Sequence, residues 1–178
     1  MKRQDVRKMV FAALFLALGL VLPFLTGQIP QIGSKLSPMH IPVLLCGFVC
    51  GWKWGLLVGA VVPILRSALF GMPPMMPTAA AMAFELAAYG LAAGVLYAML
   101  PKKAVNVYLA LIGAMIIGRA VWGIAAFALN AAMGAQFGWQ AFAAGAFVNA
   151  VPGIVLHIAL IPPIVLAMEK AGILKKEG

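Results

Sequence analysis

Three charged residues and one histidine stand within or beside otherwise apolar runs of this sequence: His40, Arg66, Glu85 and Arg119. An ionised carboxylate or guanidinium is costly to bury unless a partner compensates its charge. These residue types suit two kinds of chemistry. One is an ion pair that fixes the register of neighbouring helices. The other is a small polar site in which arginine grips a carboxylate through two hydrogen bonds. Both readings require elements that bring the four residues together.

Aromatic and amide side chains accompany these residues at helical spacing. At 100° per residue they share faces in three groups: Tyr89 with Glu85, Trp122 and Asn130 with Arg119, and Phe142 with Asn149. Together with His40 they can line one outward-facing pocket. Ionisable residues in membrane segments typically face a cavity or a pathway, and this set fits a small polar ligand.

The elements that carry these residues belong to a membrane protein. Of the 178 residues, 65% are hydrophobic and 10% are charged, and the mean hydropathy is +1.06. A soluble domain of this size needs a polar shell that this composition does not provide. The first apolar segment, Met9 to Leu25, is long and no small-residue cleavage site follows it. We therefore expect it to be a membrane span and not a signal peptide.

Breaks rich in glycine, proline and polar residues divide the chain into six predicted helices. Their expected ranges are about 9–26, 38–51, 54–70, 78–100, 105–132 and 140–168. The second and third are short, and the boundary between them is hard to place. The sequence therefore predicts an all-α bundle of six transmembrane helices, forming a single domain over residues 1–178.

Basic residues predict the orientation of this bundle. Ten of them fall on one side under the six-helix assignment: Lys2, Arg3, Arg7, Lys8, Lys53, Lys102, Lys103, Lys170, Lys175 and Lys176. Lys35 lies on the other side. The positive-inside rule then places both termini in the cytoplasm. The net charge of +9 is read as this topology signal, and no nucleic-acid partner is expected.

Counting along each helix predicts the depth of the polar residues. At 1.5 Å per residue, Arg66 lies about 18 Å and Arg119 about 21 Å from the cytoplasmic end. Glu85 lies about 10 Å from the outer end, so all three are expected at a similar level. Two arginines against one glutamate would favour an anionic ligand. His157 is predicted near the cytoplasmic end of its helix, too deep for this pocket.

Small residues are interpreted mainly as packing residues. Glycines recur at four-residue spacing, which lets helix backbones approach closely: Gly47, Gly51, Gly55 and Gly59, then Gly90 and Gly94. Cys46 and Cys50 are read as small packing residues because a redox or metal site needs further ligands. No internal repeat supports an inverted-repeat carrier.

Several chemistries find no support in the sequence. The segment "IGSK" (Ile32 to Lys35) lacks the Gly-Lys-Ser/Thr order of a phosphate loop, and H-E-x-x-H does not occur. The chain has four acidic residues in total. We therefore expect no catalytic role, no cofactor, no metal site and no ATP-driven step within this chain.

Three segments resemble one family over essentially the whole chain. They are "AALFLA", which contains Ala13 and Ala17, the run Leu36 to Gly59, "LSPMHIPVLLCGFVCGWKWGLLVG", and the run Gly71 to Gly94, "GMPPMMPTAAAMAFELAAYGLAAG". The chain is similar to the S components, the substrate-binding subunits of energy-coupling factor (ECF) vitamin transporters. The first segment is weakly specific because small residues four apart are common in membrane helices.

The resemblance implies a division of labour in a prokaryotic plasma membrane. An S component captures a vitamin at the outer face and docks on a transmembrane coupling subunit that works with two cytoplasmic ATPases. Ala13 and Ala17 would form the docking strip. Two loops would act as lids, Gly27 to Ser37 and Gly71 to Pro77. The second lid holds Pro73, Pro74, Met75 and Met76, in which prolines stiffen the loop and methionines adapt to the ligand.

Alternatives remain open at this level. Pantothenate is the leading expectation for the vitamin, with riboflavin, folate and vitamin B6 as other candidates. A self-sufficient channel or secondary carrier would need a polar pathway through the inner half, where His157 is almost the only polar residue. A structural membrane protein would not need converging charges, although a buried ion pair can serve only to fix helix register.

Overall fold

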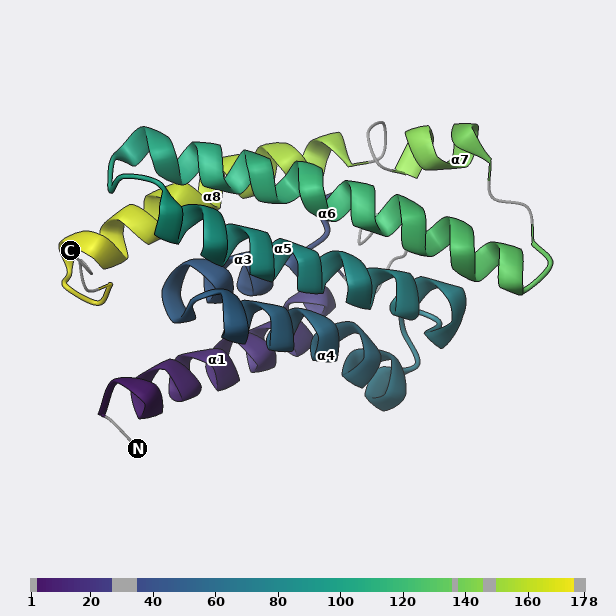
Figure 1. Cartoon of the computed structure of the whole chain (residues 1–178). Helices are drawn as coiled ribbons and strands as arrows, with labels where there is room; N and C mark the ends of the chain where they lie inside the picture. The colour runs from purple at the N-terminus through teal and green to yellow at the C-terminus, as the bar shows by residue number, and fades with distance from the viewer. Residues whose placement is uncertain (1–2, 27–34, 136–137, 146–149, 175–178) are drawn as a thin grey trace.

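The computed structural model describes residues 3–26, 35–135, 138–145 and 150–174, and these residues form helices joined by short connections (Figure 1). The elements in chain order are α1 (Arg3–Val21), η1 (Leu22–Thr26), α3 (His40–Cys50), α4 (Trp52–Phe70), η2 (Met75–Ala79), α5 (Ala80–Met99), α6 (Ala104–Ala132), α7 (Trp139–Ala143) and α8 (Val151–Lys170). The predicted all-α class is confirmed.

Five of the helical segments in the described residues are long and apolar enough to cross a membrane. They are Gln4–Leu25, Trp52–Phe70, Met75–Met99, Ala104–Ala132 and Val151–Lys170, and α3 is a shorter apolar helix. The fold is therefore a membrane helical bundle, as the sequence predicts. The ends of these spans lie within a few residues of the predicted ends. The first span starts earlier than predicted, at Gln4, and the last starts later, at Val151.

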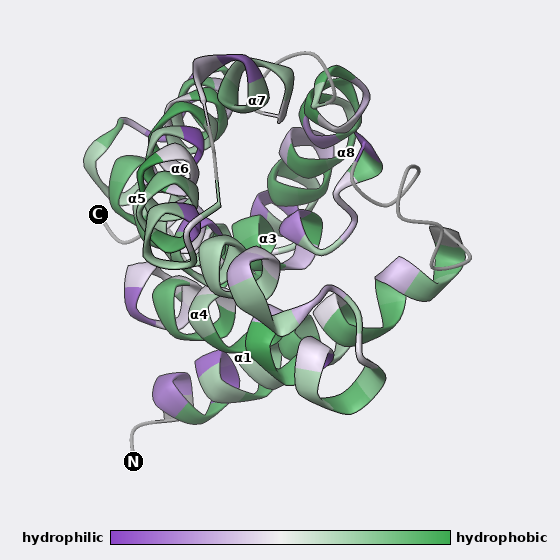
Figure 2. Cartoon of the chain, turned by 90° about the vertical axis from the view of Figure 1, so that its right-hand side faces the viewer, coloured by the Kyte–Doolittle hydropathy of each residue, from purple (hydrophilic) through white to green (hydrophobic). Residues whose placement is uncertain are grey.

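The short helix α3 lies at the centre of the bundle. Figure 2 looks along the helices and shows α3 enclosed by α1, α4, α5 and α8, and α3 packs against each of these four helices. Almost every residue of α3 is buried. At 1.5 Å per residue an 11-residue helix spans about 16 Å, roughly half of the hydrocarbon core. Its first residue, His40, is buried inside the bundle.

Glycines bring α4 and α5 into direct backbone contact. A Cβ atom built on Gly55 would lie 2.5 Å from the carbonyl oxygen of Gly90, and one built on Gly90 would lie 2.2 Å from that of Gly55. Gly59 approaches the carbonyl of Leu86 in the same way, at 2.2 Å. Real side chains do not tolerate these distances, so the prediction of close packing is confirmed for these glycines. It is wrong for Gly51, whose Cβ would meet nothing within 4 Å.

Local signals explain where α4 begins and ends. Gly51 separates α3 from α4 with a φ of 90°, and Gly71 ends α4 with a φ of 70°. Both conformations suit glycine because it has no Cβ. Proline and alanine mark the start of the next helix, α5. Pro77 lies in η2 just before it, and the alanine-rich segment that follows has high helix propensity.

The sixth predicted helix, 140–168, is wrong as a single element. The structure divides it into α7, which ends at Ala143, and α8, which begins at Val151. Pro152 stands at the start of α8, where a missing N–H costs nothing because the first turn has no partner for it. The sequence is apolar both before and after Val151, so hydropathy did not indicate that a helix starts there.

The beginning of α1 and the end of α8 lie at the same end of the bundle (Figure 1). Nη2 of Arg7 donates a hydrogen bond of 2.5 Å to the carbonyl oxygen of Ile173. The α3–α4 junction and the α5–α6 connection reach this same end, so the basic residues Lys53, Lys102 and Lys103 gather there with Arg7. The predicted charge asymmetry is thus a property of the fold, while its cytoplasmic orientation stays a prediction.

Candidate functional site

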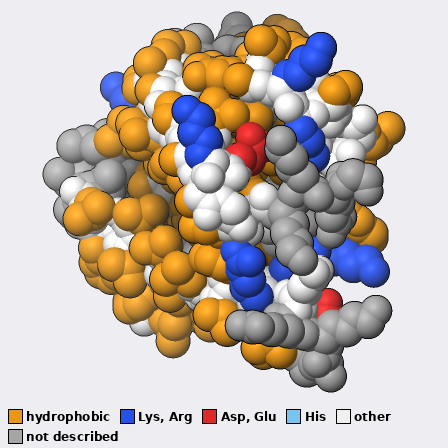
Figure 3. All heavy atoms as spheres, turned by 90° about the vertical axis from the view of Figure 1, so that its left-hand side faces the viewer, with side chains coloured by type: hydrophobic (Ala, Val, Ile, Leu, Met, Phe, Trp, Pro, Cys, Tyr) orange, Lys and Arg blue, Asp and Glu red, His pale blue; other side chains and the backbone are white. Residues whose placement is uncertain are grey.

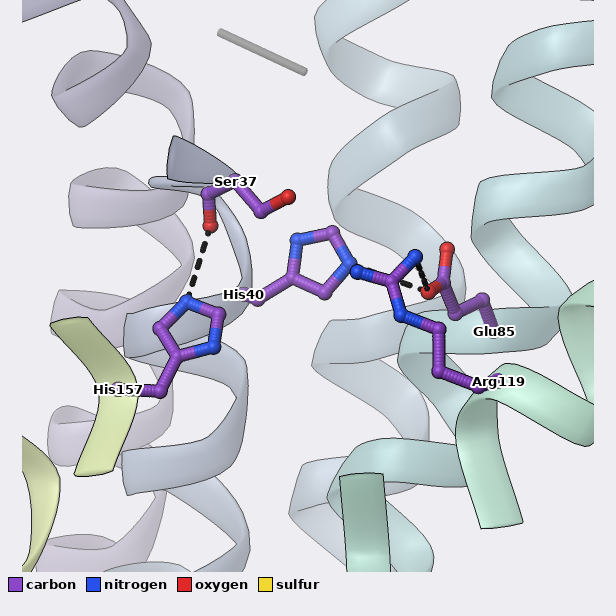
Figure 4. A network of polar contacts seen from close by, with 5 residues as sticks. All are labelled: Ser37, His40, Glu85, Arg119 and His157. Atoms are coloured by element: carbon purple, nitrogen blue, oxygen red, sulfur yellow. Dashed lines mark hydrogen bonds and ion pairs between the residues drawn. The ribbon is translucent and has the colours of Figure 1, made fainter. Parts of the chain in front are cut away.

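Glu85 and Arg119 form an ion pair between α5 and α6. Nη1 of Arg119 lies 3.0 Å from Oε1 of Glu85, and only 2% of the Glu85 side chain and 15% of that of Arg119 are exposed. An unpaired carboxylate at this burial would be strongly unfavourable, so Arg119 provides the compensating charge. The sequence placed these two residues at a similar depth, and the structure brings them together (Figure 4).

His40 approaches the same carboxylate from the start of α3. Its Nε2 lies 3.4 Å from Oε1 of Glu85, and both side chains are almost fully buried. Among the described residues, neither ring nitrogen of His40 nor Nε of Arg119 has a hydrogen-bond partner. Buried polar atoms are normally satisfied. This cluster therefore has hydrogen-bonding capacity to offer a ligand, which an ion pair built only for helix register would not need.

Tyr89 stands one turn after Glu85 on α5 and covers His40. The two rings meet edge to face, with centroids 5.2 Å apart, and Tyr89 is 1% exposed. Gly118 of α6 makes room for this ring, since a Cβ there would lie 2.6 Å from Cδ1 of Tyr89. The glycine beside Arg119 thus positions the aromatic wall, a role that the sequence analysis missed.

His157 joins this cluster, contrary to the prediction that it lies too deep. Its ring is stacked on that of His40 with centroids 5.9 Å apart, and its Nε2 lies 3.4 Å from the carbonyl oxygen of Ser37 (Figure 4). The error follows from the undivided sixth helix: because α8 begins at Val151, His157 is less than two turns from the helix start and level with the start of α3.

Backbone packing holds α8 in this position. A Cβ on Gly153 would lie 2.7 Å from the carbonyl oxygen of Lys35, so α8 touches the backbone just before α3. Gly153 and His157 are one turn apart on the same face. Ser37 adopts a φ of 47°, and its carbonyl also accepts the backbone N–H of His40 at 3.0 Å. One carbonyl thereby orients both histidines.

Arg66 lies elsewhere, contrary to the predicted shared pocket. Its Nη1 donates a hydrogen bond to the carbonyl oxygen of Leu20. Its guanidinium carbon is 4.7 Å from the ring centroid of Phe24 and 5.3 Å from that of Phe70. Arg66 therefore ties the end of α4 to the end of α1. The position of a residue along a helix does not determine the face on which its side chain emerges.

The remaining predicted residues separate into two groups. Trp122 and Phe142 stack with centroids 6.1 Å apart, and Trp139 approaches Phe142 at 5.3 Å, so α6 and α7 share an aromatic contact. Asn130 instead donates to the carbonyl of Ala126 on its own helix, at 2.7 Å. Asn149 lies outside the described residues.

The second predicted lid has more structure than a loop. Residues Met75–Ala79 form the turn η2, which packs against α4, α5 and α6. The backbone N–H of Ala79 donates to the carbonyl of Pro74 at 2.9 Å. Met75 and Met76 are 42% and 47% exposed, and their role as a lid stays a prediction. Most of the first predicted lid, residues 27–34, lies outside the described residues.

The described residues contain no group of three or more histidine, cysteine or acidic side chains that could hold a metal ion. Glu85, Arg119, His40 and Tyr89 instead form a buried polar cluster with cationic and acceptor groups from three helices. Such a cluster can bind the charged and hydroxyl groups of a small organic molecule. In a membrane bundle, this arrangement is typical of a site that recognises a small molecule.

A family model agrees with this interpretation. The model described as "ECF transporter, substrate-specific component" matches residues 7–165, which is most of the chain. The chain belongs to this family of transporter subunits, so its role is transport and the family is not one of enzymes. No match was found among curated proteins or among solved structures.

Proposed function

We propose that this chain captures a water-soluble vitamin at the outer side of a prokaryotic plasma membrane, with pantothenate as the best candidate. The observation that carries the proposal is the buried cluster around Glu85, in which His40 and Arg119 retain nitrogens without hydrogen-bond partners. Family members are substrate-specific components, and a substrate site needs such unsatisfied groups.

Arg119 is the one predicted arginine that lies at the cluster around Glu85. The sequence prediction counted two arginines against Glu85, but Arg66 faces Phe24 and Phe70. Arg119 and Glu85 then balance each other, and what the cluster offers an anion is the set of nitrogens on Arg119 and His40 that lack hydrogen-bond partners. A carboxylate ligand can accept hydrogen bonds there, and such bonds are strong away from water.

Pantothenate has groups that suit both the cluster around Glu85 and the predicted aromatic residues. Its carboxylate can accept hydrogen bonds from Arg119 and His40, while its hydroxyl and amide groups suit Glu85 and Tyr89. Its gem-dimethyl group suits the aromatic contact of Trp122 and Phe142. Riboflavin, folate and vitamin B6 are the competing vitamins, and a screen of the purified chain against a panel of water-soluble vitamins ranks them directly.

Isothermal titration of pantothenate and its neutral alcohol analogue tests the anion site. The wild type should bind the acid more tightly than the alcohol. Arg119→Gln should weaken binding of the acid by about tenfold or more, since a charge-assisted hydrogen bond is lost. Arg119→Lys should retain part of the affinity. Arg66→Gln is the matched control and should leave the affinity nearly unchanged. Equal binding of acid and alcohol would reject the proposal.

We also propose that transport requires partners, namely a transmembrane coupling subunit and two ATPase subunits. Ala13 and Ala17 are exposed on the outward face of α1, whereas Ala12 and Phe15 are buried. This exposure supports the predicted docking strip. The purified chain alone should bind ligand without accumulating it in liposomes, and concentrative uptake by the chain alone would favour the secondary-carrier alternative.

A substitution separates docking from capture. Ala17→Trp should reduce vitamin uptake in cells that contain the partner subunits while leaving ligand affinity unchanged, because bulk on the strip blocks close helix approach. Leu14→Trp is the control, since Leu14 is large and already 51% exposed. A parallel loss of ligand affinity in Ala17→Trp would show instead that Ala17 supports the fold.

A further inference from the structure

A second polar site lies at the end of the bundle where α1 begins and α8 ends. Lys and Arg side chains gather on this face (Figure 3). A pocket of about 200 Å³ opens there between α1, the α3–α4 junction and the end of α5. Its lining includes three cations and three aromatic rings: Arg7, Lys8, Lys102, Phe11, Phe48 and Tyr97. This site shares no residue with the cluster around Glu85.

The structure holds the cations against the walls of the pocket. The guanidinium carbon of Arg7 lies 5.7 Å from the ring centroid of Phe11, and Arg7 also donates to the carbonyl of Ile173. Nζ of Lys102 lies 3.5 Å from the ring centroid of Tyr97 and donates to the carbonyl of that residue. Lys8 is half-buried. Ring and carbonyl contacts reduce the entropy that these long side chains lose when they bind an anion.

The pocket carries an excess of positive charge. No acidic residue is among the described residues that line it. The nearby carboxylate of Glu169 accepts a hydrogen bond from the hydroxyl of Tyr97, so that acid is engaged outside the lining. Gln4 adds an amide to the rim. The lining thus combines several N–H donors for an oxyanion with apolar rings for a neighbouring carbon skeleton.

We propose that this pocket binds a phosphate-bearing anion at the membrane surface. Arginine and lysine are the usual ligands of phosphate oxygens, and the volume suits a small head group. The exposed apolar residues Val6, Met9 and Val10 of α1 place the pocket beside the lipid-facing surface. The phosphate can come from an anionic phospholipid or from a soluble phosphate ester, and both present the same group to the cations.

A role of these basic residues in membrane orientation alone predicts a different pattern of anion binding. If these basic residues serve only to orient the chain in the membrane, every lysine on this face should contribute equally to anion binding. Lys103 is the next residue after Lys102, is exposed and does not line the pocket. The pair Lys102→Gln and Lys103→Gln therefore separates a built site from general surface charge.

Native mass spectrometry of the purified full chain in neutral detergent measures this directly. Phosphatidylglycerol should bind more tightly than phosphatidylcholine, and Lys102→Gln and Arg7→Gln should each weaken it by about fivefold. Lys103→Gln should change the affinity by less than about twofold, as expected for a charge outside the pocket. Equal losses in Lys102→Gln and Lys103→Gln would overturn the proposal.

Two further measurements complete the test. Ala98→Trp keeps every charge but places a bulky ring on the pocket wall, so it should weaken binding as much as Lys102→Gln; unchanged binding would also overturn the proposal. Thermal shift with inorganic phosphate and glycerol 3-phosphate forms the second arm. Stabilisation by these soluble ligands, lost in Lys102→Gln, identifies a soluble phosphate, whereas phosphatidylglycerol binding alone identifies a lipid. Binding of neither contradicts the site.

Discussion

Arg66 and Arg119 are two arginines of similar predicted depth that the fold treats differently. Arg66 is 2% exposed and is held by a backbone carbonyl and two phenylalanine rings. Arg119 is 15% exposed and is held by a carboxylate that also faces His40. The aromatic and carbonyl setting of Arg66 serves to join two helix ends. The setting of Arg119 leaves polar atoms without partners and therefore fits recognition.

The largest expected effect comes from breaking the ion pair that distinguishes Arg119. Arg119→Gln leaves the Glu85 carboxylate buried with only the weaker contact to His40, and the free energy of unfolding should fall by about 3–5 kcal/mol. The double variant Glu85→Gln, Arg119→Gln should recover most of this loss. Thermal unfolding in detergent measures both. A double variant no more stable than Arg119→Gln would show that the pair itself does not carry the effect.

A smaller effect is expected at Gly118, which shapes the wall beside Arg119. Gly118→Ala places a methyl group 2.6 Å from Cδ1 of Tyr89, and this overpacking should cost about 1–3 kcal/mol of stability and weaken ligand binding. Gly113→Ala on the same helix is the control, because its Cβ meets only the flexible end of Leu96 at 2.9 Å. Equal losses of ligand affinity in both variants would contradict a specific role of Tyr89.

Arg66→Gln tests whether Arg66 contributes to stability and not to ligand binding. Loss of the ring contacts and of the hydrogen bond to Leu20 should reduce stability by about 1–2 kcal/mol, while ligand affinity in the folded fraction stays the same. Thermal unfolding and calorimetry on the same preparations separate the two quantities. A fall in affinity comparable to that of Arg119→Gln would place Arg66 in the binding site after all.

The smallest effect is expected for Asn130→Ala. The amide of Asn130 bonds to the carbonyl of Ala126 on its own helix, so its removal should change both stability and affinity by less than about 0.5 kcal/mol. The same titration and unfolding measurements apply. A clear loss of affinity would return Asn130 to the predicted pocket.

Sequence patterns predicted the fold more fully than the site. Apolar length identified most of the helices, and the glycine spacing indicated close backbone approach, because these depend on composition along one segment. Counting along the helices placed Glu85 and Arg119 at a similar level but did not decide which arginine pairs with Glu85. The histidine stack could not be predicted because it depends on the break before Val151. Arg66 was misplaced because its partner is a backbone carbonyl, and a carbonyl has no signature in the sequence.

The bare contact between Gly55 and Gly90 also has a mechanical side. Where main chains touch without an intervening layer of side chains, two helices cannot slide or tilt against each other without steric clashes. We therefore expect α4 and α5 to move as one rigid unit. If a ligand reaches Glu85 as proposed, we expect the bundle to open by movement of helices other than this pair. The contact between α6 and α7, by contrast, is made by side chains, including the stacked rings of Trp122 and Phe142.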